Sequence, residues 1–298
     1  MIKINSSYKY LLFFFTLIAL ISFCETSNSQ NNDSRASACA ATIPTDAALE
    51  WQWCSTQPAT QIITIYKVAF CTALPTEPTG TTATGMTNCT TVFENTAGAT
   101  VSIQNGTGTT PNGTFTDPPY GNYTFAYVEL SPTFTYKANL VFSLGKFKTF
   151  SSNGSGLGGT NCQTNGTAYA HWGEFSGITC QVDVGVAANT NVTLNSLDNE
   201  AALYAARFPG TNGNTDVYLI KTDGTLATTS SSNNAGNVAK VIAFVPMTAK
   251  ITPDTASYNL RYNNTRGMTV EQKLGGGIGG TSMISFSIAY FDMTFEIQ

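Results

Sequence analysis

The sequence predicts an all-β protein, an antiparallel β-sandwich with one lobe or two, one or two short helices and three disulfides. Three observations lead to this prediction. Only 11% of the 298 residues are charged, and threonine, a β-branched residue that favours strands, occurs 46 times. Apolar and polar residues alternate with a period of two in several segments, as they do in half-buried strands. The chain also contains seven cysteines, enough for three pairs in an oxidising compartment.

The first 23 residues have the pattern of a secretory signal peptide. Lys3 and Lys9 precede an apolar run over residues 11–23, and polar residues follow at once without a basic stop-transfer cluster. A helix that spans a bilayer needs about 20 apolar residues. The short run therefore favours a cleaved signal over the alternative, a retained membrane anchor.

Cys24, at the end of the apolar run, resembles the lipidated cysteine of bacterial lipoproteins. Phe23 stands where that family usually has Gly, Ala or Ser, a departure similar to the relaxed motif of spirochaete lipoproteins. The resemblance implies that Cys24 becomes the mature N-terminus and carries acyl chains. These chains would anchor the protein to the outer membrane, with its body exposed at the cell surface. The alternative is ordinary cleavage near residues 36–38 and secretion as a soluble protein.

This interpretation divides the chain into a signal peptide over 1–23, a polar tether over 24–45 and a β-sandwich body over 46–298. If the body has two lobes, their boundary is expected near residue 190. Cleavage removes two of the 14 basic residues and none of the 18 acidic ones, which gives a mature charge of 12 − 18 = −6. A negative surface repels nucleic-acid phosphates and anionic lipid headgroups. We therefore expect no nucleic-acid partner, and a membrane contact only through the lipid anchor.

Removing Cys24 from the count leaves six cysteines, and six allow 15 connectivities. Proximity in the sequence favours the pairs Cys39–Cys54, Cys71–Cys89 and Cys162–Cys180. Each would close a loop of roughly 15–20 residues and stabilise the fold by about 3 kcal/mol. No Cys-x-x-Cys spacing occurs and the chain has one histidine, so a Cys/His zinc site is excluded.

Strands are expected where β-branched and aromatic residues run together or alternate with polar ones. Thr60–Cys71 suits a buried central strand. Phe134–Phe142 has apolar residues at even positions, and Tyr258–Asn263 alternates in the same way. Further strands are expected at Thr179–Val186, Asp216–Lys221 and Val238–Val245, with a hairpin turn at Asp223-Gly224.

Two short helical segments are also expected. Thr45 suits the N-cap of a helical turn that runs towards Trp53. Asn199–Arg207 is rich in alanine, follows Asp198 and stops before Pro209, which together are typical of a short helix.

The C-terminal strand changes the parity of its apolar residues. They occupy even positions from Ile284 to Tyr290 and odd positions from Phe291 to Ile297. Two opposite alternations that meet in one segment predict a bulge, or a strand that changes sheets, at Tyr290-Phe291.

The segment Asp117–Leu130, with the sequence DPPYGNYTFAYVEL, resembles the start of a strand in the prealbumin-like sandwich domains of bacterial surface proteins. The resemblance covers about residues 60–142 and implies a sandwich in which Tyr123, Phe125 and Tyr127 line one face. It supplies no catalytic residues.

Few residues suggest chemistry. The single histidine, His171, has neither a Gly-x-Ser-x-Gly motif nor a free thiol as a partner, so a structural role is expected. Glu129, Glu174 and Asp183 are acids of the kind that glycosidases use, but the sequence does not show the separation that such a pair needs. We therefore expect a protein that is not an enzyme and binds no cofactor.

Two other motifs also have structural explanations. The acids Asp198, Glu200, Asp216 and Asp223 carry the oxygen ligands that calcium prefers, but they lack the spacing of a calcium loop, so turn and cap roles are expected instead of a metal site. The glycine run over 154–159 matches Gly-x-Gly-x-x-Gly without the strand and helix that give this motif its meaning.

The leading functional prediction is a non-enzymatic, lipid-anchored surface protein that interacts with, or adheres to, protein or glycan partners. One alternative is a pilin-like subunit that assembles by strand addition, with Phe291–Gln298 as the donor strand. Another is a carbohydrate-binding module. Its candidate ligand-binding aromatics are Trp51, Trp53 and Trp172, which could stack on a sugar or pack over a disulfide.

Overall fold

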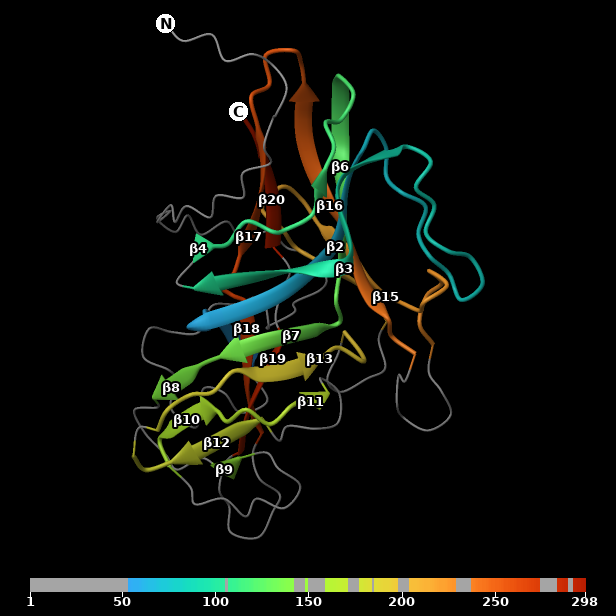
Figure 1. Ribbon diagram of the computed structural model, residues 1–298. Helices are drawn as coiled ribbons and strands as arrows, with labels where there is room; N and C mark the ends of the chain where they lie inside the picture. The colour runs from blue at the N-terminus through green and yellow to red at the C-terminus, as the bar shows by residue number, and fades with distance from the viewer. Residues whose placement is uncertain are drawn as a thin grey trace, which may run out of the picture.

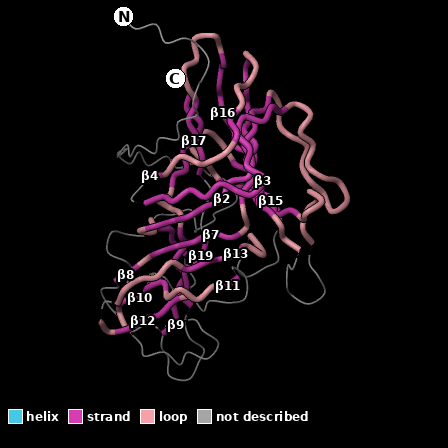
Figure 2. Tube along the Cα trace, viewed as in Figure 1, coloured by secondary structure: helices cyan, strands magenta, loops and turns pink. Residues whose placement is uncertain are grey.

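The protein is all-β in the part of the chain that the computed structural model describes, and none of those residues is helical (Figure 2). The described residues are 53–104, 107–141, 148–149, 159–170, 177–183, 185–197, 204–228, 237–273, 283–288 and 292–298. They form twenty strands: β1 Trp53–Thr56, β2 Thr60–Cys71, β3 Cys89–Gln104, β4 Thr107–Gly108, β5 Thr114–Phe115, β6 Gly121–Leu130, β7 Thr133–Lys137, β8 Asn139–Val141, β9 Lys148–Thr149, β10 Asn161–Thr164, β11 Tyr169–Ala170, β12 Ile178–Gln181, β13 Thr190–Thr193, β14 Ala205–Phe208, β15 Thr215–Ile220, β16 Lys240–Ile251, β17 Tyr258–Asn263, β18 Met268–Lys273, β19 Met283–Ile288 and β20 Asp292–Ile297.

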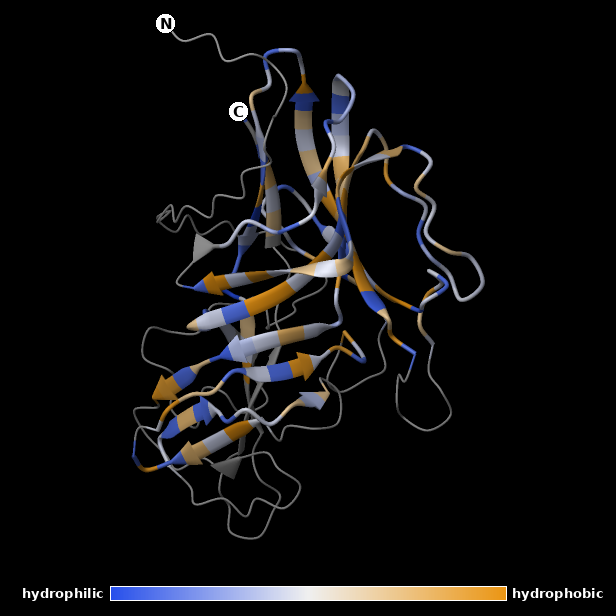
Figure 3. Ribbon diagram, in the orientation of Figure 1, coloured by the Kyte–Doolittle hydropathy of each residue, from blue (hydrophilic) through white to orange (hydrophobic). Residues whose placement is uncertain are grey.

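Strand β2 is the centre of the largest sheet and has the bounds that the sequence predicts. One of its edges pairs with β3, and the other pairs first with β7 and then with β6. Buried and half-buried residues alternate over residues 60–66, and residues 68–71 are all buried. Hydrophobic residues recur along both β2 and β3 (Figure 3). Phe70, on this strand, is fully buried. The β-branched and aromatic composition of β2 therefore fits a strand that is covered on both faces.

The strands β6, β7 and β8 follow one another along the chain and join three groups of strands. β6 pairs with β16, β7 pairs with β13, and β8 pairs with β10 of a separate three-stranded sheet. The predicted alternation over 134–142 is confirmed where the residues are described: Phe134, Tyr136, Ala138 and Leu140 are buried. The even-numbered residues of β7 and β8 therefore face the core along the whole segment, although β7 pairs with β13 and β8 pairs with β10.

A long ribbon of the four strands β17 to β20 forms the layer behind β2, β3 and β7 (Figure 1). β1 and β9 extend its β18–β19 part to a four-stranded sheet. β17 pairs with β20, and β18 pairs with β19. Four residues separate β17 from β18, and three separate β19 from β20, so one strand holds one extra residue at the junction. This offset is the signature of a bulge. The extra residue lies between β17 and β18, and β19 and β20 belong to different sheets. The position predicted for the change, Tyr290-Phe291, lies outside the described residues.

The main core lies between this ribbon and the large sheet. Tyr258 packs against Phe70 with ring centroids 5.1 Å apart, and Phe295 meets the same ring edge-on at 5.3 Å. Met268 of β18 and Met293 of β20 are also buried in this cluster. The C-terminal strand β20 thus packs within its own fold.

A second, smaller apolar cluster covers the opposite face of β6, β16 and β15. It contains Tyr127, Tyr218 and Phe244. The loop over 72–88 reaches the turn that follows β15, where the amide of Leu226 donates a hydrogen bond to a carbonyl of this loop at 2.8 Å. Both faces of this part of the sheet are therefore covered.

Two of the three predicted disulfides are confirmed. Cys71–Cys89 joins directly opposite residues of β2 and β3 and closes the 72–88 loop. Cys162–Cys180 joins opposite residues of β10 and β12. The third predicted pair, Cys39–Cys54, lies outside the described residues because Cys39 does.

The predicted helix over Asn199–Arg207 is wrong in its described part, because Ala205–Phe208 is strand β14. Arg207 lies directly opposite Asp216 of β15, and its guanidinium donates two hydrogen bonds to that carboxylate, at 2.5 and 3.0 Å. Tertiary pairing with β15 overrides the helical propensity of the alanines. The other predicted helical turn, over 45–53, lies outside the described residues except for Trp53, which begins β1.

The prediction that Tyr123, Phe125 and Tyr127 share one face is also wrong. Tyr123 belongs to the main core, whereas Phe125 and Tyr127 pack in the second cluster. The partner strand β16 has a register irregularity between Pro246 and Ala249, opposite this part of β6. A bulge of this kind changes which side chains face the core.

Two other predictions hold only in part. The strand expected over Thr179–Val186 ends at Gln181. Asp223-Gly224 does form a turn, with Gly224 at a φ of 81°, but only a single bridge between Ile220 and Leu226 follows it. The strands that pair with β15 over several residues are β14 and β16 instead.

Candidate binding pocket at the tip of the molecule

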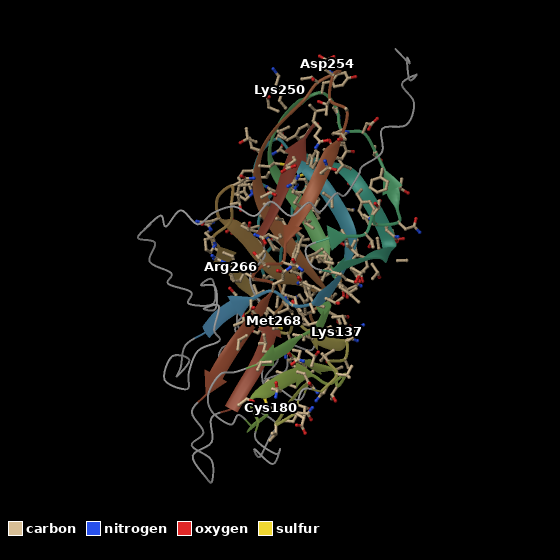
Figure 4. All side chains as sticks on the ribbon, turned by 90° about the vertical axis from the view of Figure 1, so that its left-hand side faces the viewer. Lys137, Cys180, Lys250, Asp254, Arg266 and Met268 are labelled. Carbon is tan, nitrogen blue, oxygen red and sulfur yellow. A yellow bond between two sulfur atoms is a disulfide. The ribbon has the colours of Figure 1, made fainter. Side chains whose placement is uncertain are left out.

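A pocket of about 330 Å³ lies at the end of the molecule where β6 begins and β16 ends. One wall is the segment Asp117–Tyr120. The other is formed by Ile251 and Thr255–Tyr258. Lys250 and Asp254 lie at the same end, and Cys180 lies at the opposite end (Figure 4). We call this feature the tip pocket.

Two buried tyrosines hold the first wall in place. Tyr123 donates its hydroxyl hydrogen to the carbonyl of Pro119 at 2.8 Å, and Tyr258 donates to the carbonyl of Thr116 at 3.0 Å. Pro118 and Pro119 fix two consecutive φ angles. Burial, with the charge of Asp117 as a second cause, raises the pKa of Tyr258, so its hydroxyl stays protonated and able to donate.

The second wall is a hydrogen-bonded turn tied to the C-terminus. The amide of Thr255 donates to the carbonyl of Thr252, and the amide of Thr252 donates to the Thr255 hydroxyl, both at 3.0 Å. The amides of Ala256 and Ser257 donate to the carbonyl of Gln298 at 2.6 and 3.0 Å. Both walls are therefore fixed by hydrogen bonds.

The chemistry of the tip pocket combines an exposed ring with polar groups. On the first wall, Pro118 is buried, and Pro119 and Tyr120 after it are exposed. The Tyr120 side chain is 66% exposed. Asp117 provides a carboxylate, and Ser257 provides a hydroxyl. An apolar pocket with a few convergent polar groups is typical of a ligand-binding site.

A second pocket, of about 220 Å³, lies between the 72–88 loop and the sheet. It contains Glu129, whose carboxylate accepts hydrogen bonds from the Tyr127 hydroxyl at 2.8 Å and from the ammonium group of Lys240. Lys240 also lies over the ring of Tyr66, 5.1 Å from its centroid. Burial, followed by the charge of Glu129, raises the pKa of Tyr127. Glu129, one of the acids that the sequence suggested for a glycosidase pair, is therefore hydrogen-bonded to Tyr127 and Lys240.

The other acids with predicted roles are explained in part. Asp183 lies at an exposed bend two residues after β12, and Glu174 lies outside the described residues. Asp216 is paired with Arg207. Asp223 accepts hydrogen bonds from the amide and hydroxyl of Thr225 at 2.9 and 2.6 Å, which lower its pKa. The turn role predicted for Asp223 is confirmed.

Several predicted site residues lie outside the described part of the chain: Cys24, Trp51, His171, Trp172, Asp198 and Glu200. Trp53 is described only as the first residue of β1. Gly159, the last residue of the glycine run, approaches the backbone of Gln181 so closely that a Cβ would lie 1.8 Å from its carbonyl carbon. Close packing accounts for that glycine.

No group of three or more His, Cys, Asp or Glu side chains in the described ranges gathers where a metal ion could be held. Within the same ranges, no helix has the length and hydropathy that crossing a bilayer requires.

Sequence reasoning missed the tip pocket, although it singled out one wall of it. Pro118, Pro119 and Tyr120 are part of the segment that resembles a prealbumin-like strand, and there they served only to predict the fold. An aromatic residue after two prolines, directly before a strand, was the available signal. The opposite wall comes from residues more than 130 positions later, and no local pattern connects the two.

No protein-family model, no curated protein sequence and no solved structure matches this chain.

Proposed function

We propose that this chain is a non-enzymatic, lipid-anchored protein of the cell envelope, with a β-sandwich body whose tip pocket contacts partners outside the cell. The apolar leader and Cys24 support the anchor. Disulfides persist in oxidising compartments outside the cytoplasm, and two of them cross-link the described strands. The observation that carries the contact role is Tyr120, a large aromatic side chain held 66% exposed beside a pocket.

The arrangement of the layers supports the sandwich. The ribbon of β17–β20 packs against the large sheet through Phe70, Tyr258 and Phe295, which is how two sheets share one core. The pairing of all six residues of β20 with β17 favours a strand that completes its own fold over a donor strand for a neighbouring subunit. We therefore place the pilin-like alternative second.

Metabolic labelling with a clickable palmitate tests the anchor. The wild-type protein should be labelled and the Cys24→Ala variant should not, and trypsin added to intact cells should digest the labelled protein. An unlabelled wild type, or equal labelling of the variant, would contradict the anchor. Protection from trypsin would contradict surface exposure.

The contact role has a separate test on intact cells. Cells that carry the wild-type protein should adhere to one another or to neighbouring cells more than cells that carry Tyr120→Ala. Val186→Ala, which alters another exposed apolar residue (89% exposed), is the matched control and should adhere like the wild type. Equal adherence of all three strains would contradict the role of the tip.

A further inference from the structure

The charge of the tip pocket limits the ligands that it could take. Among its lining residues, Asp117 is the one that carries a charge. Lys250 and Asp254, which flank the second wall in the sequence, lie at the same end of the molecule (Figure 4), so these three residues sum to one negative charge. The chain as a whole, with a formal net charge of −4, is acidic as well. Phosphate, sulfate and carboxylate groups are therefore repelled, which leaves neutral and cationic ligands.

The exposed ring of Tyr120 offers a flat apolar surface. Its backbone follows two prolines, and the carbonyl of Pro119 is fixed by the buried Tyr123 hydroxyl. The backbone that carries the ring is thus fixed before a ligand arrives, so less conformational entropy is lost on binding. A flat ligand face of C–H groups, such as one side of a sugar ring, suits such a surface.

The polar groups of the pocket suit hydroxyls. The Asp117 carboxylate accepts hydrogen bonds, and the Ser257 hydroxyl both donates and accepts. Each sugar hydroxyl also donates and accepts. The volume of about 330 Å³ lies at the low end of the range for small-ligand pockets, about 300–1,000 Å³, which suits a compact ligand better than an extended peptide.

We propose that the tip pocket binds a neutral carbohydrate, with one sugar face on Tyr120 and sugar hydroxyls on Asp117 and Ser257. This inference rests on the proposed contact role and names its ligand class. It places the sugar site away from Trp51, Trp53 and Trp172, the aromatics that the sequence suggested for it.

A glycan array tests the proposal with the full chain. Arrayed neutral glycans should bind, and sialylated or sulfated glycans should not. Calorimetry with the methyl glycoside of the best neutral sugar then compares variants. Tyr120→Ala should weaken binding about tenfold or more, Tyr120→Phe should keep it, and Asp117→Asn should weaken it. Val186→Ala should bind like the wild type, and unchanged melting curves would show that the exposed substitutions leave the fold intact.

Three outcomes would overturn the carbohydrate proposal: binding to acidic glycans alone, binding of tetramethylammonium or a proline-rich peptide with no neutral glycan bound, or binding that is insensitive to Tyr120→Ala. The adherence test separates this failure from a failure of the contact role. If Tyr120→Ala reduces adherence while no neutral glycan binds, the tip contacts a partner of another class. If adherence is also unchanged, both proposals fail.

Discussion

Glu129 illustrates how this sheet accommodates a charged residue at a largely buried position. Its side chain is only 12% exposed, and its two oxygens accept hydrogen bonds from Tyr127 and Lys240. Burying a carboxylate without partners is costly, so the two donors make the position tolerable. Lys240 lies at the edge of the cluster, with 38% of its side chain exposed, and water reduces the net contribution of the ion pair.

Substituting Glu129→Gln should destabilise the protein by about 1–3 kcal/mol, because the charge-assisted hydrogen bonds are lost while the Tyr127 hydroxyl stays buried. Urea denaturation of the two proteins measures this difference. The matched control is Glu94→Gln, which removes the partner of Lys67 from a pair in which the Glu94 side chain is 46% exposed. That variant should lose at most about 1 kcal/mol. Equal losses in both variants would contradict the role of burial.

At the scale of elements, sequence patterns predicted a strand well when its own residues determined its burial. Thr60–Cys71 is an example, because β-branched and aromatic residues fill the whole strand. The helix over 199–207 failed because β15, which is later in the sequence, recruits Ala205–Phe208 into the sheet. The face of Phe125 was also wrong, since it depends on an irregularity in β16. Local composition does not contain either piece of information.

Deletion of residues 291–298 should prevent folding. It removes β20, the partner of all of β17, together with the buried Met293 and with Phe295, which packs on Phe70. Each large apolar side chain lost from a core costs about 2–5 kcal/mol, against a typical total stability of about 5–15 kcal/mol. Circular dichroism and thermal melting measure the outcome. Removing Gln298 alone, which follows β20 and has an exposed side chain, loses only its hydrogen bonds with Ala256 and Ser257 and should leave a cooperative melt.

A cooperative, near-wild-type melt of the long deletion would contradict a self-completing strand. In that case the segment would be free to serve a neighbouring subunit, and a folded monomer that no longer assembles would support the pilin-like alternative.

At the scale of the whole molecule, composition and cysteine spacing predicted the all-β class and two of the disulfides. They did so because strand propensity and short loop closure are properties of nearby residues. The tip pocket was not predictable in this way, since Tyr120 and Tyr258 line one pocket only when β6 and β16 pair. The tyrosines also show a property that arises only in the folded protein. Seven of the described tyrosines have pKa values above the ordinary one of about 10, with burial as the largest cause. The shift is largest in five of them: Tyr127, Tyr136, Tyr169, Tyr218 and Tyr258.

This shift predicts alkaline unfolding. Below pH ~10 these tyrosines are protonated in both states, so their protonation does not make the free energy of unfolding depend on pH. Above pH ~10 the unfolded chain releases the protons while the folded one keeps them. The free energy of unfolding should then fall by about 1.4 kcal/mol per pH unit for each such tyrosine. The tyrosinate absorbance of these buried residues should therefore appear together with the loss of the circular dichroism signal, in one transition. Tyr169→Phe, which removes one fully buried phenol, should make the slope shallower by about 1.4 kcal/mol per pH unit. Gradual ionisation of these tyrosines in a protein that stays folded would contradict the conclusion that burial raises their pKa values.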